Sequence, residues 1–212
     1  MKREAAFFSV KPGKEGTVKP FFEANTANIN FACRVFGAKN ASVWTVGNLV
    51  YAYGEFEDAS EFSLKDLIPK VLKVYLDEIS APGEARLMYH CIGNVRGDKS
   101  LIRRRVFATK LKEGCADEYF ARHDALVKAR GELVPDGPET NFTIHCAQNK
   151  YIFGYCELVK SYDHPMTEDE KASTIAWETR QLEIMDWLTD DVDWITGESH
   201  PKIQNLFLQE GY

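Results

Sequence analysis

Hydrophobic and polar positions along the chain predict a succession of short strands and helices. The segment YIFGYCEL at 151–158 is rich in aromatic residues and follows the turn-forming AQNK, which is typical of a β-strand. LVYAYGEFE at 49–57 follows VGN in the same way and also predicts a strand. In the segment 67–79, Val71, Val74 and Tyr75 recur at helical spacing and predict a helix.

The order of these segments repeats about 100 residues further along the chain, which indicates two similar halves. Glu55 in the first half falls on Glu157 in the second. The matched pairs are strands at 6–11 and 105–110, helix starts at 19–27 and 117–125, strands at 40–46 and 141–147, strands at 49–57 and 151–159, helices at 67–79 and 179–191, and last strands at 85–95 and 202–210.

Each half therefore has the order β-α-β-β-α-β, the ferredoxin-like pattern of the α+β class. A sheet covered by helices on one face has to bury its other face. We therefore expect the two βαββαβ repeats to pack sheet to sheet around a barrel-like core. Glycine and charged residues interrupt the apolar pattern at 94–101, so the expected domains are residues 1–98 and 99–212.

Charge and cysteine usage narrow the class of protein. The net charge is −6, and RRR at 103–105 is the only tight basic cluster; a nucleic-acid partner is disfavoured because phosphate neutralisation needs a positive surface. No apolar run approaches the ~20 residues of a membrane span, and the first residues do not resemble a signal peptide. Five scattered cysteines without CxxC spacing fit a reducing compartment. We expect a soluble cytoplasmic protein without a membrane partner.

The segment DEYFARHDAL at 117–126 carries the strongest candidate chemistry. Tyr119 and His123 lie four residues apart, so they share a helix face. The matching positions of the first half hold Phe21 and Asn25. The pair is either a structural contact or a reactive site. His145, early in the strand 141–147, either faces the same cavity or is an ordinary strand residue.

Several segments of the second half resemble the L-rhamnose mutarotase family. They are RRVFATKL, ADEYFARHDAL, NFTIHCAQNKYIFGYCEL and the closing LTDDVDW and HPKIQNLF, and together they span most of residues 103–210. Members of this family are homodimers of the dimeric α+β barrel type. They interconvert the α and β anomers of a sugar without a cofactor. The resemblance implies that the chain is a fused, duplicated version of the family's dimer.

The resemblance also implies roles for particular residues. His123 matches the family's proposed proton donor, and Tyr119 matches a tyrosine that contacts the sugar. Phe142 falls on a second sugar-contacting tyrosine, so its hydroxyl is missing here. The family's tryptophan pair falls on Ile184 and Met185. Trp177 and Trp187 lie nearby in the sequence, and we expect them to offer a stacking surface for the sugar.

The sequence thus predicts an isomerase, a cofactor-free and metal-free sugar mutarotase that acts on L-rhamnose or a related deoxy sugar. A histidine suits this chemistry because its ordinary pKa lies near 6.5. The alternative is a dimeric α+β barrel protein that binds a sugar or another small ligand without catalysis, or a monooxygenase-like enzyme. Whether two such chains form a homodimer is left open.

Overall fold

The computed structural model describes residues 1–80, 84–133, 139–161, 167–189 and 202–211. It divides into two compact units. The N-terminal unit consists of Met1–Arg86 together with Ile203–Tyr212, and the C-terminal unit consists of Leu87–Lys202.

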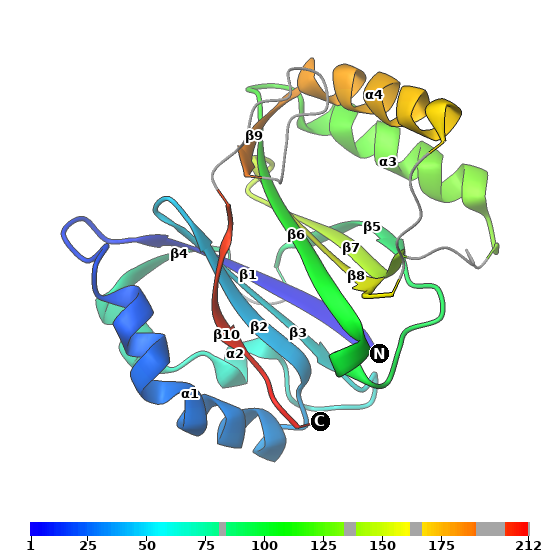
Figure 1. The fold of residues 1–212 in the computed structure, drawn as a ribbon. Coiled ribbons are helices and arrows are strands. Elements are labelled where there is room, and N and C mark those ends of the chain that lie inside the picture. The colour runs from blue at the N-terminus through cyan, green and yellow to red at the C-terminus, as the bar shows by residue number, and fades with distance from the viewer. Residues whose placement is uncertain (81–83, 134–138, 162–166, 190–201, 212) are drawn as a thin grey trace. The chain divides into compact units, whose positions relative to one another are not determined.

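The N-terminal unit is built on a five-stranded antiparallel sheet with the strand order β10-β2-β3-β1-β4 (Figure 1). The helix α1 (Val18–Val35) and the short helices α2 (Leu64–Leu67) and η1 (Lys70–Val74) pack their buried side chains into one apolar cluster with this sheet. The strands are β1 (Lys2–Val10), β2 (Lys39–Val46), β3 (Leu49–Phe56), β4 (Leu76–Ser80) and β10 (Gln204–Leu208).

The C-terminal unit has a second five-stranded sheet, with the order β5-β7-β8-β6-β9. Its helices α3 (Ala116–Arg130) and α4 (Glu168–Leu182) lie on the same side of the sheet (Figure 1). The strands are β5 (Arg86–Cys91), β6 (Ile102–Leu111), β7 (Glu139–Ala147), β8 (Tyr151–Val159) and β9 (Met185–Thr189), and the short helix η2 (Lys99–Leu101) precedes β6.

The predicted α+β class with a ferredoxin-like arrangement of strands and helices is confirmed. Corresponding strands occupy corresponding places in the two sheets, since β1, β2, β3 and β4 of one match β6, β7, β8 and β9 of the other. The packing of one sheet on the other stays a prediction.

The last strand of each half joins the sheet of the other half. β5 pairs with β7, and the backbone N–H of Asn141 donates to the carbonyl of Ile92 at 2.7 Å. β10 pairs with β2, and the N–H of Gln209 donates to the carbonyl of Ala41 at 2.8 Å. The expectation that segments 85–95 and 202–210 complete their own halves was therefore wrong. The sequence suggested a division after residue 98. In the structure, residues 87–98 belong to the C-terminal unit and residues 203–212 belong to the N-terminal unit.

The predicted helix at 67–79 is also wrong. Pro69 lacks an N–H, and the residue before it, Ile68, has an extended backbone with ψ 110°. The chain therefore leaves α2 at Leu67, makes the short 3-10 turn η1 and pairs as β4 with β1. Val71 and Val74, whose spacing suggested a buried helix face, are exposed.

The predicted helix at 179–191 begins much earlier in the structure. Thr167 caps α4 through a capping box, in which its hydroxyl accepts from the N–H of Glu170 and the Glu170 carboxylate accepts from the N–H of Thr167. The helix ends at Leu182, and β9 then pairs with β6. Residues 190 and 191 of the predicted helix lie outside the described residues.

A β-bulge occurs in the first strand of each unit and shows which residues of β1 and β6 correspond. In β1 the pairing with β4 shifts between Phe7 and Phe8, and in β6 the pairing with β9 shifts between Ala108 and Thr109. Phe7 thus corresponds to Ala108, and the predicted match of segments 6–11 and 105–110 was two residues out of register. Successive side chains alternate between faces, so a two-residue shift preserves the face and escapes notice in the sequence.

Both units carry a buried carboxylate at a second bulge. Asn141 has a positive φ of 53° and its Nδ2 donates to Glu157 at 3.1 Å; the Tyr155 hydroxyl donates to the same carboxylate at 3.0 Å. Lys99 adds an ion pair of 2.7 Å. Asn40 and Glu55 repeat the arrangement in the N-terminal unit, with φ 54° and a bond of 2.6 Å. An asparagine tolerates the left-handed conformation that this bulge requires.

Candidate functional site

Helix α3 presents Tyr119 and His123 to the interior of the C-terminal unit. The side chains are 2% and 4% exposed, so neither faces solvent. Arg122 anchors this part of the helix, because its Nε donates to Glu118 at 3.1 Å and its Nη2 to Glu183 at 3.2 Å. The bond to Glu118 lies within α3, whereas the bond to Glu183 ties α3 to the end of α4.

The hydrogen bond of His123 defines the state of its ring. Nδ1 lies 3.0 Å from the backbone carbonyl of Tyr119. A carbonyl only accepts, so Nδ1 carries the proton and Nε2 keeps a free lone pair in the neutral ring. Burial lowers the pKa of His123, although the Tyr119 carbonyl and Asp124 oppose this shift. Burial therefore favours the neutral imidazole, which is able to accept a proton at Nε2.

His123 and five aromatic residues form a series of ring contacts, which we call the aromatic series. Each contact is edge-to-face, a favourable arrangement for aromatic pairs. The centroid distances are 5.9 Å for Trp177–His123, 6.1 Å for His123–Tyr89, 5.4 Å for Tyr89–Phe142, 6.3 Å for Phe142–Phe107 and 5.8 Å for Phe107–Trp187. The Tyr119 ring also contacts His123, with centroids 4.1 Å apart and the ring planes tilted by 37°.

Of the five residues that the sequence singled out, Tyr119 and Trp177 contact His123 directly, whereas Phe142 and Trp187 are linked to it only through Tyr89 and Phe107. His123 and Tyr119 are buried, whereas Phe142, Trp177 and Trp187 are partly exposed. Trp177 lies directly against His123, and sugars pack their apolar faces on partly exposed rings of this kind. Ile184 and Met185, at the positions of the family's tryptophan pair, are buried in the same apolar cluster as Tyr119.

Tyr89 is a member of the aromatic series that sequence reasoning missed. It lies on β5, which the sequence assigned to the other half of the chain, so nothing local connected it with His123. Its ring is half-buried, and the Arg130 guanidinium lies 5.6 Å from its centroid. Burial raises the pKa of Tyr89, so its hydroxyl stays protonated and able to donate a hydrogen bond.

Phe107 reaches its place only because residue 154 is a glycine. The two residues lie directly opposite each other on β6 and β8. A Cβ on Gly154 would approach the Phe107 ring to 2.1 Å, far inside van der Waals contact. Gly154 therefore positions the ring that supports both Phe142 and Trp187.

The hydroxyl of Tyr119 is also kept neutral. Burial raises its pKa, and the Cys146 thiol and the Glu178 carboxylate raise it further. A neutral phenol can donate a hydrogen bond to a sugar oxygen. Glu178, on α4 beside Trp177, is thus a further acidic group near the pair that the sequence did not single out.

His145 does not belong to this group. Phe142, Ile144 and Cys146 of β7 pack in the cluster beneath α3. Side chains alternate along a strand, so His145 lies on the opposite face of the sheet, where it is buried. This outcome matches the expectation of an ordinary strand residue.

The described part of the chain shows neither a metal-binding cluster nor a membrane-spanning helix. There, no group of three or more His, Cys, Asp or Glu side chains is arranged to hold a metal ion. No helix among the same residues is long and apolar enough to cross a bilayer. The five cysteines, all within the described ranges, are free thiols.

Comparison with known proteins gives one family match. Residues 104–207 match the family described as L-rhamnose mutarotase, and this range contains His123, Tyr119 and all but one member of the aromatic series. No curated protein matches the chain. Among solved structures, the chain is similar to a candidate monooxygenase from Fusobacterium nucleatum subsp. nucleatum ATCC 25586. That match has a TM-score of 0.39 and 13% identity, and it covers 98% of this chain and 90% of the other. Just under half of the chain is therefore similar to a sugar mutarotase family.

Proposed function

We propose that this protein is a cofactor-free sugar mutarotase whose single site lies in the C-terminal unit. The observation that carries the proposal is the buried, neutral His123, held by the Tyr119 carbonyl and flanked by the aromatic series. The match of residues 104–207 to the L-rhamnose mutarotase family supports it. We further propose that the chain is a fused pair of repeats, the first of which has lost the site.

The reaction opens a sugar hemiacetal, turns the aldehyde and closes the ring on its other face. The lone pair on Nε2 of His123 accepts the proton of the anomeric hydroxyl as the bond between the anomeric carbon and the ring oxygen breaks. The resulting imidazolium gives this proton to the ring oxygen, which leaves a neutral histidine and an open-chain aldehyde. Closure reverses these transfers. A positioned acid–base group typically accelerates such a step by about 10²–10⁴-fold.

The remaining groups hold the substrate. Tyr119 offers a neutral hydroxyl next to the imidazole. Trp177, Phe142 and Trp187 offer partly exposed rings for the apolar face of a deoxy sugar such as L-rhamnose. Phe142 stands at the position where the family carries a tyrosine, and the ring of Tyr89 contacts it. Tyr89 thus offers a hydroxyl close to the one that is missing at Phe142.

Anomer exchange measured by saturation-transfer NMR on L-rhamnose and L-fucose tests the proposal. His123→Asn is the informative variant, because Asn25 already makes the equivalent bond to the carbonyl of Phe21 in the N-terminal unit, at 2.8 Å. The variant keeps this backbone contact and loses the proton acceptor. We expect the exchange rate to fall by about 10²–10⁴-fold. Asn25→Ala is the matched control and should exchange like the wild type.

Two outcomes would contradict the proposal. One is a wild-type protein that gives no exchange above buffer with any sugar tested. The other is a folded His123→Asn variant that exchanges as fast as the wild type. Saturable binding of L-rhamnose without exchange would instead identify a sugar-binding protein without catalysis.

A further inference from the structure

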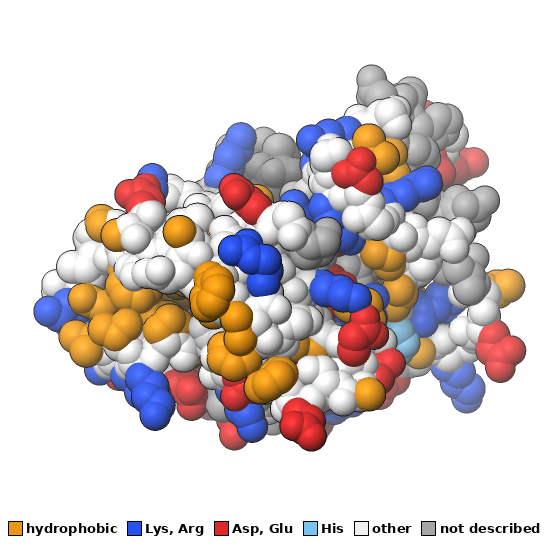
Figure 2. Space-filling view, turned by 90° about the horizontal axis from the view of Figure 1, so that it is seen from below, with side chains coloured by type: hydrophobic (Ala, Val, Ile, Leu, Met, Phe, Trp, Pro, Cys, Tyr) orange, Lys and Arg blue, Asp and Glu red, His pale blue; other side chains and the backbone are white. Residues whose placement is uncertain are grey.

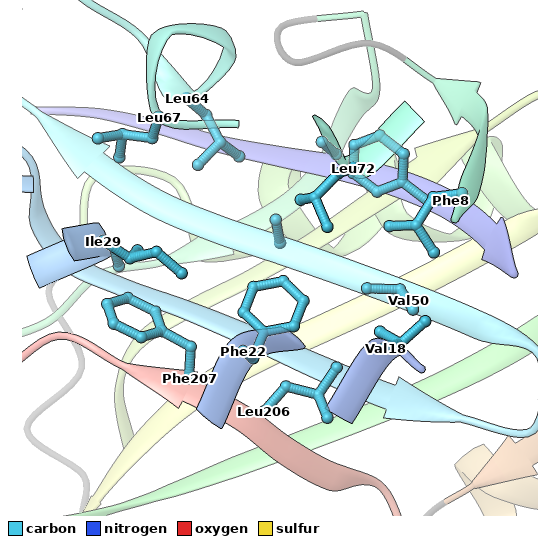
Figure 3. Close-up of a cluster of buried hydrophobic side chains, with 14 of the residues drawn as sticks. Phe8, Val18, Phe22, Ile29, Val50, Leu64, Leu67, Leu72, Leu206 and Phe207 are labelled. Atoms are coloured by element: carbon cyan, nitrogen blue, oxygen red, sulfur yellow. The ribbon is translucent and has the colours of Figure 1, made fainter. Parts of the chain in front are cut away.

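The N-terminal unit contains an apolar pocket between its helices and its sheet. Within it, about 40 Å³ can hold the centre of a water-sized sphere, a few times the space that one water molecule needs. Side chains from α1, α2, η1, β1, β3 and β10 gather over one face of the sheet around this space (Figure 3). The lining includes Phe22, Ile29, Ala41, Leu67, Leu72 and Phe207.

Comparison of the two units explains the space. The bulges at Asn40 and Asn141 show that Ala41 corresponds to Phe142. The shared bulge in the first strands makes Ala6 correspond to Phe107. Two rings that fill the helix-covered face in the C-terminal unit are thus methyl groups here. Ala41 lines the pocket, and Ala6 belongs to the surrounding cluster.

The lining offers no polar partner for a sugar. Two lining side chains carry hydroxyl groups, and both are engaged outside the pocket: Ser42 accepts from the indole N–H of Trp44 at 2.9 Å, and Tyr53 donates to Glu55 at 3.1 Å. Burial raises the pKa of the lining thiol Cys33 to about 11, so it is uncharged. A sugar would lose its hydrogen bonds to water on entry and find few replacements.

We propose that the N-terminal unit binds a compact, uncharged apolar ligand in this pocket, of the size of a small aromatic or branched hydrocarbon. Such a ligand is stabilised by the apolar area that it removes from water. An apolar cavity of this kind stays dry and accepts hydrocarbons, because water has no partners there. The site would be distinct in chemistry from the histidine site of the C-terminal unit.

The probe toluene, which is uncharged and of the proposed size, tests this site in the full-length protein when it is titrated by isothermal calorimetry. We expect saturable binding with one molecule per chain. Ala41→Phe introduces the ring that the C-terminal unit has as Phe142, so it should weaken binding at least tenfold. Circular dichroism and the melting temperature would show that this variant is folded.

A control separates the pocket from the apolar surface around it. Hydrophobic side chains also lie exposed on the molecule (Figure 2), and Phe31 on α1 is 63% exposed. Phe31→Ser removes such a side chain from the same helix without touching the lining, so it should leave the dissociation constant within twofold of the wild-type value.

Direct contacts in the wild-type protein give a second measurement that needs no variant. We expect intermolecular NOEs between the probe and the methyl groups of Ile29, Leu67 and Leu72. The proposal fails if these NOEs are absent, if a folded Ala41→Phe variant binds as the wild type does, or if Phe31→Ser abolishes binding. Displacement of the probe from the pocket by L-rhamnose would overturn its apolar character.

Discussion

The contact between Phe107 and Gly154 gives a prediction whose size follows from the structure. Gly154→Ala places a Cβ 2.1 Å from the Phe107 ring, where ordinary contacts are about 3.5–4.0 Å. The ring is held between Phe142 and Trp187 and cannot turn away freely. Overpacking of this kind typically costs about 1–3 kcal/mol. For a chain of this length we expect the melting temperature to fall by roughly 2–12 °C.

The N-terminal unit has two alanines at the positions of Phe107 and Gly154, so Phe107→Ala combined with Gly154→Ala is the matched double variant. Ala6 lies opposite Ala52 on β1 and β3, where the C-terminal unit has Phe107 opposite Gly154. Phe107→Ala alone should cost about 3–5 kcal/mol because it leaves a cavity. In that background Gly154→Ala meets no ring, and it should stabilise the protein by about 0.5–1 kcal/mol, the usual gain of alanine over glycine inside a strand.

Urea unfolding of the wild type, both single variants and the double variant measures this coupling. Circular dichroism and tryptophan fluorescence should be followed together, since two units need not unfold in one step. If Gly154→Ala costs the same with and without the ring, to within about 0.5 kcal/mol, the two residues do not couple and the reasoning is refuted.

Three further predictions concern the site and the buried carboxylate. The exchange rate should fall on acidification with a midpoint below about 6.5, because the pKa of His123 is lowered in the folded protein. Over the same pH range the unfolded chain binds this proton more readily than the folded protein does. The free energy of unfolding should therefore also fall as pH falls, and it should fall less in His123→Asn. Tyr89→Ala should raise the half-saturating sugar concentration by about 2–10-fold, and Tyr89→Phe by less, in exchange measurements at varied sugar concentration; equal effects would show that the ring itself is unimportant. Lys99→Met leaves Glu157, which is fully buried, without its ammonium partner and should cost about 3–5 kcal/mol in urea unfolding; a neutral result would mean that hydrogen bonds suffice for this carboxylate.

Local patterns predicted the parts of the fold that depend on nearby residues. The strands around Glu55 and Glu157 and the helix that carries His123 were found, because alternation and helical spacing are properties of neighbours. The helix expected at 67–79 failed, since Pro69 and pairing with β1 outweighed the spacing of Val71 and Val74. The start of α4 carried a readable signal, the capping box of Thr167 and Glu170, that was overlooked.

The site was predictable only as far as its residues lie close in the sequence or match a family pattern. Tyr119 and His123 share one helix, and Phe142 was found through the resemblance. Tyr89 could not be found in this way, because strand pairing between β5 and β7 is non-local and leaves no mark in either segment. The role of Gly154 likewise depends on a ring across the sheet.

The exchanged strands bear on what happens when the protein is diluted or cut. A fragment that starts at residue 99 would keep His123 but lose β5 and Tyr89, and β7 would become an open edge that can pair with another chain. In the intact polypeptide the missing strand is supplied by the same molecule, at an effective concentration that dilution cannot change. Covalent linkage therefore makes the completeness of the histidine site independent of protein concentration, which an assembly of separate halves could not achieve.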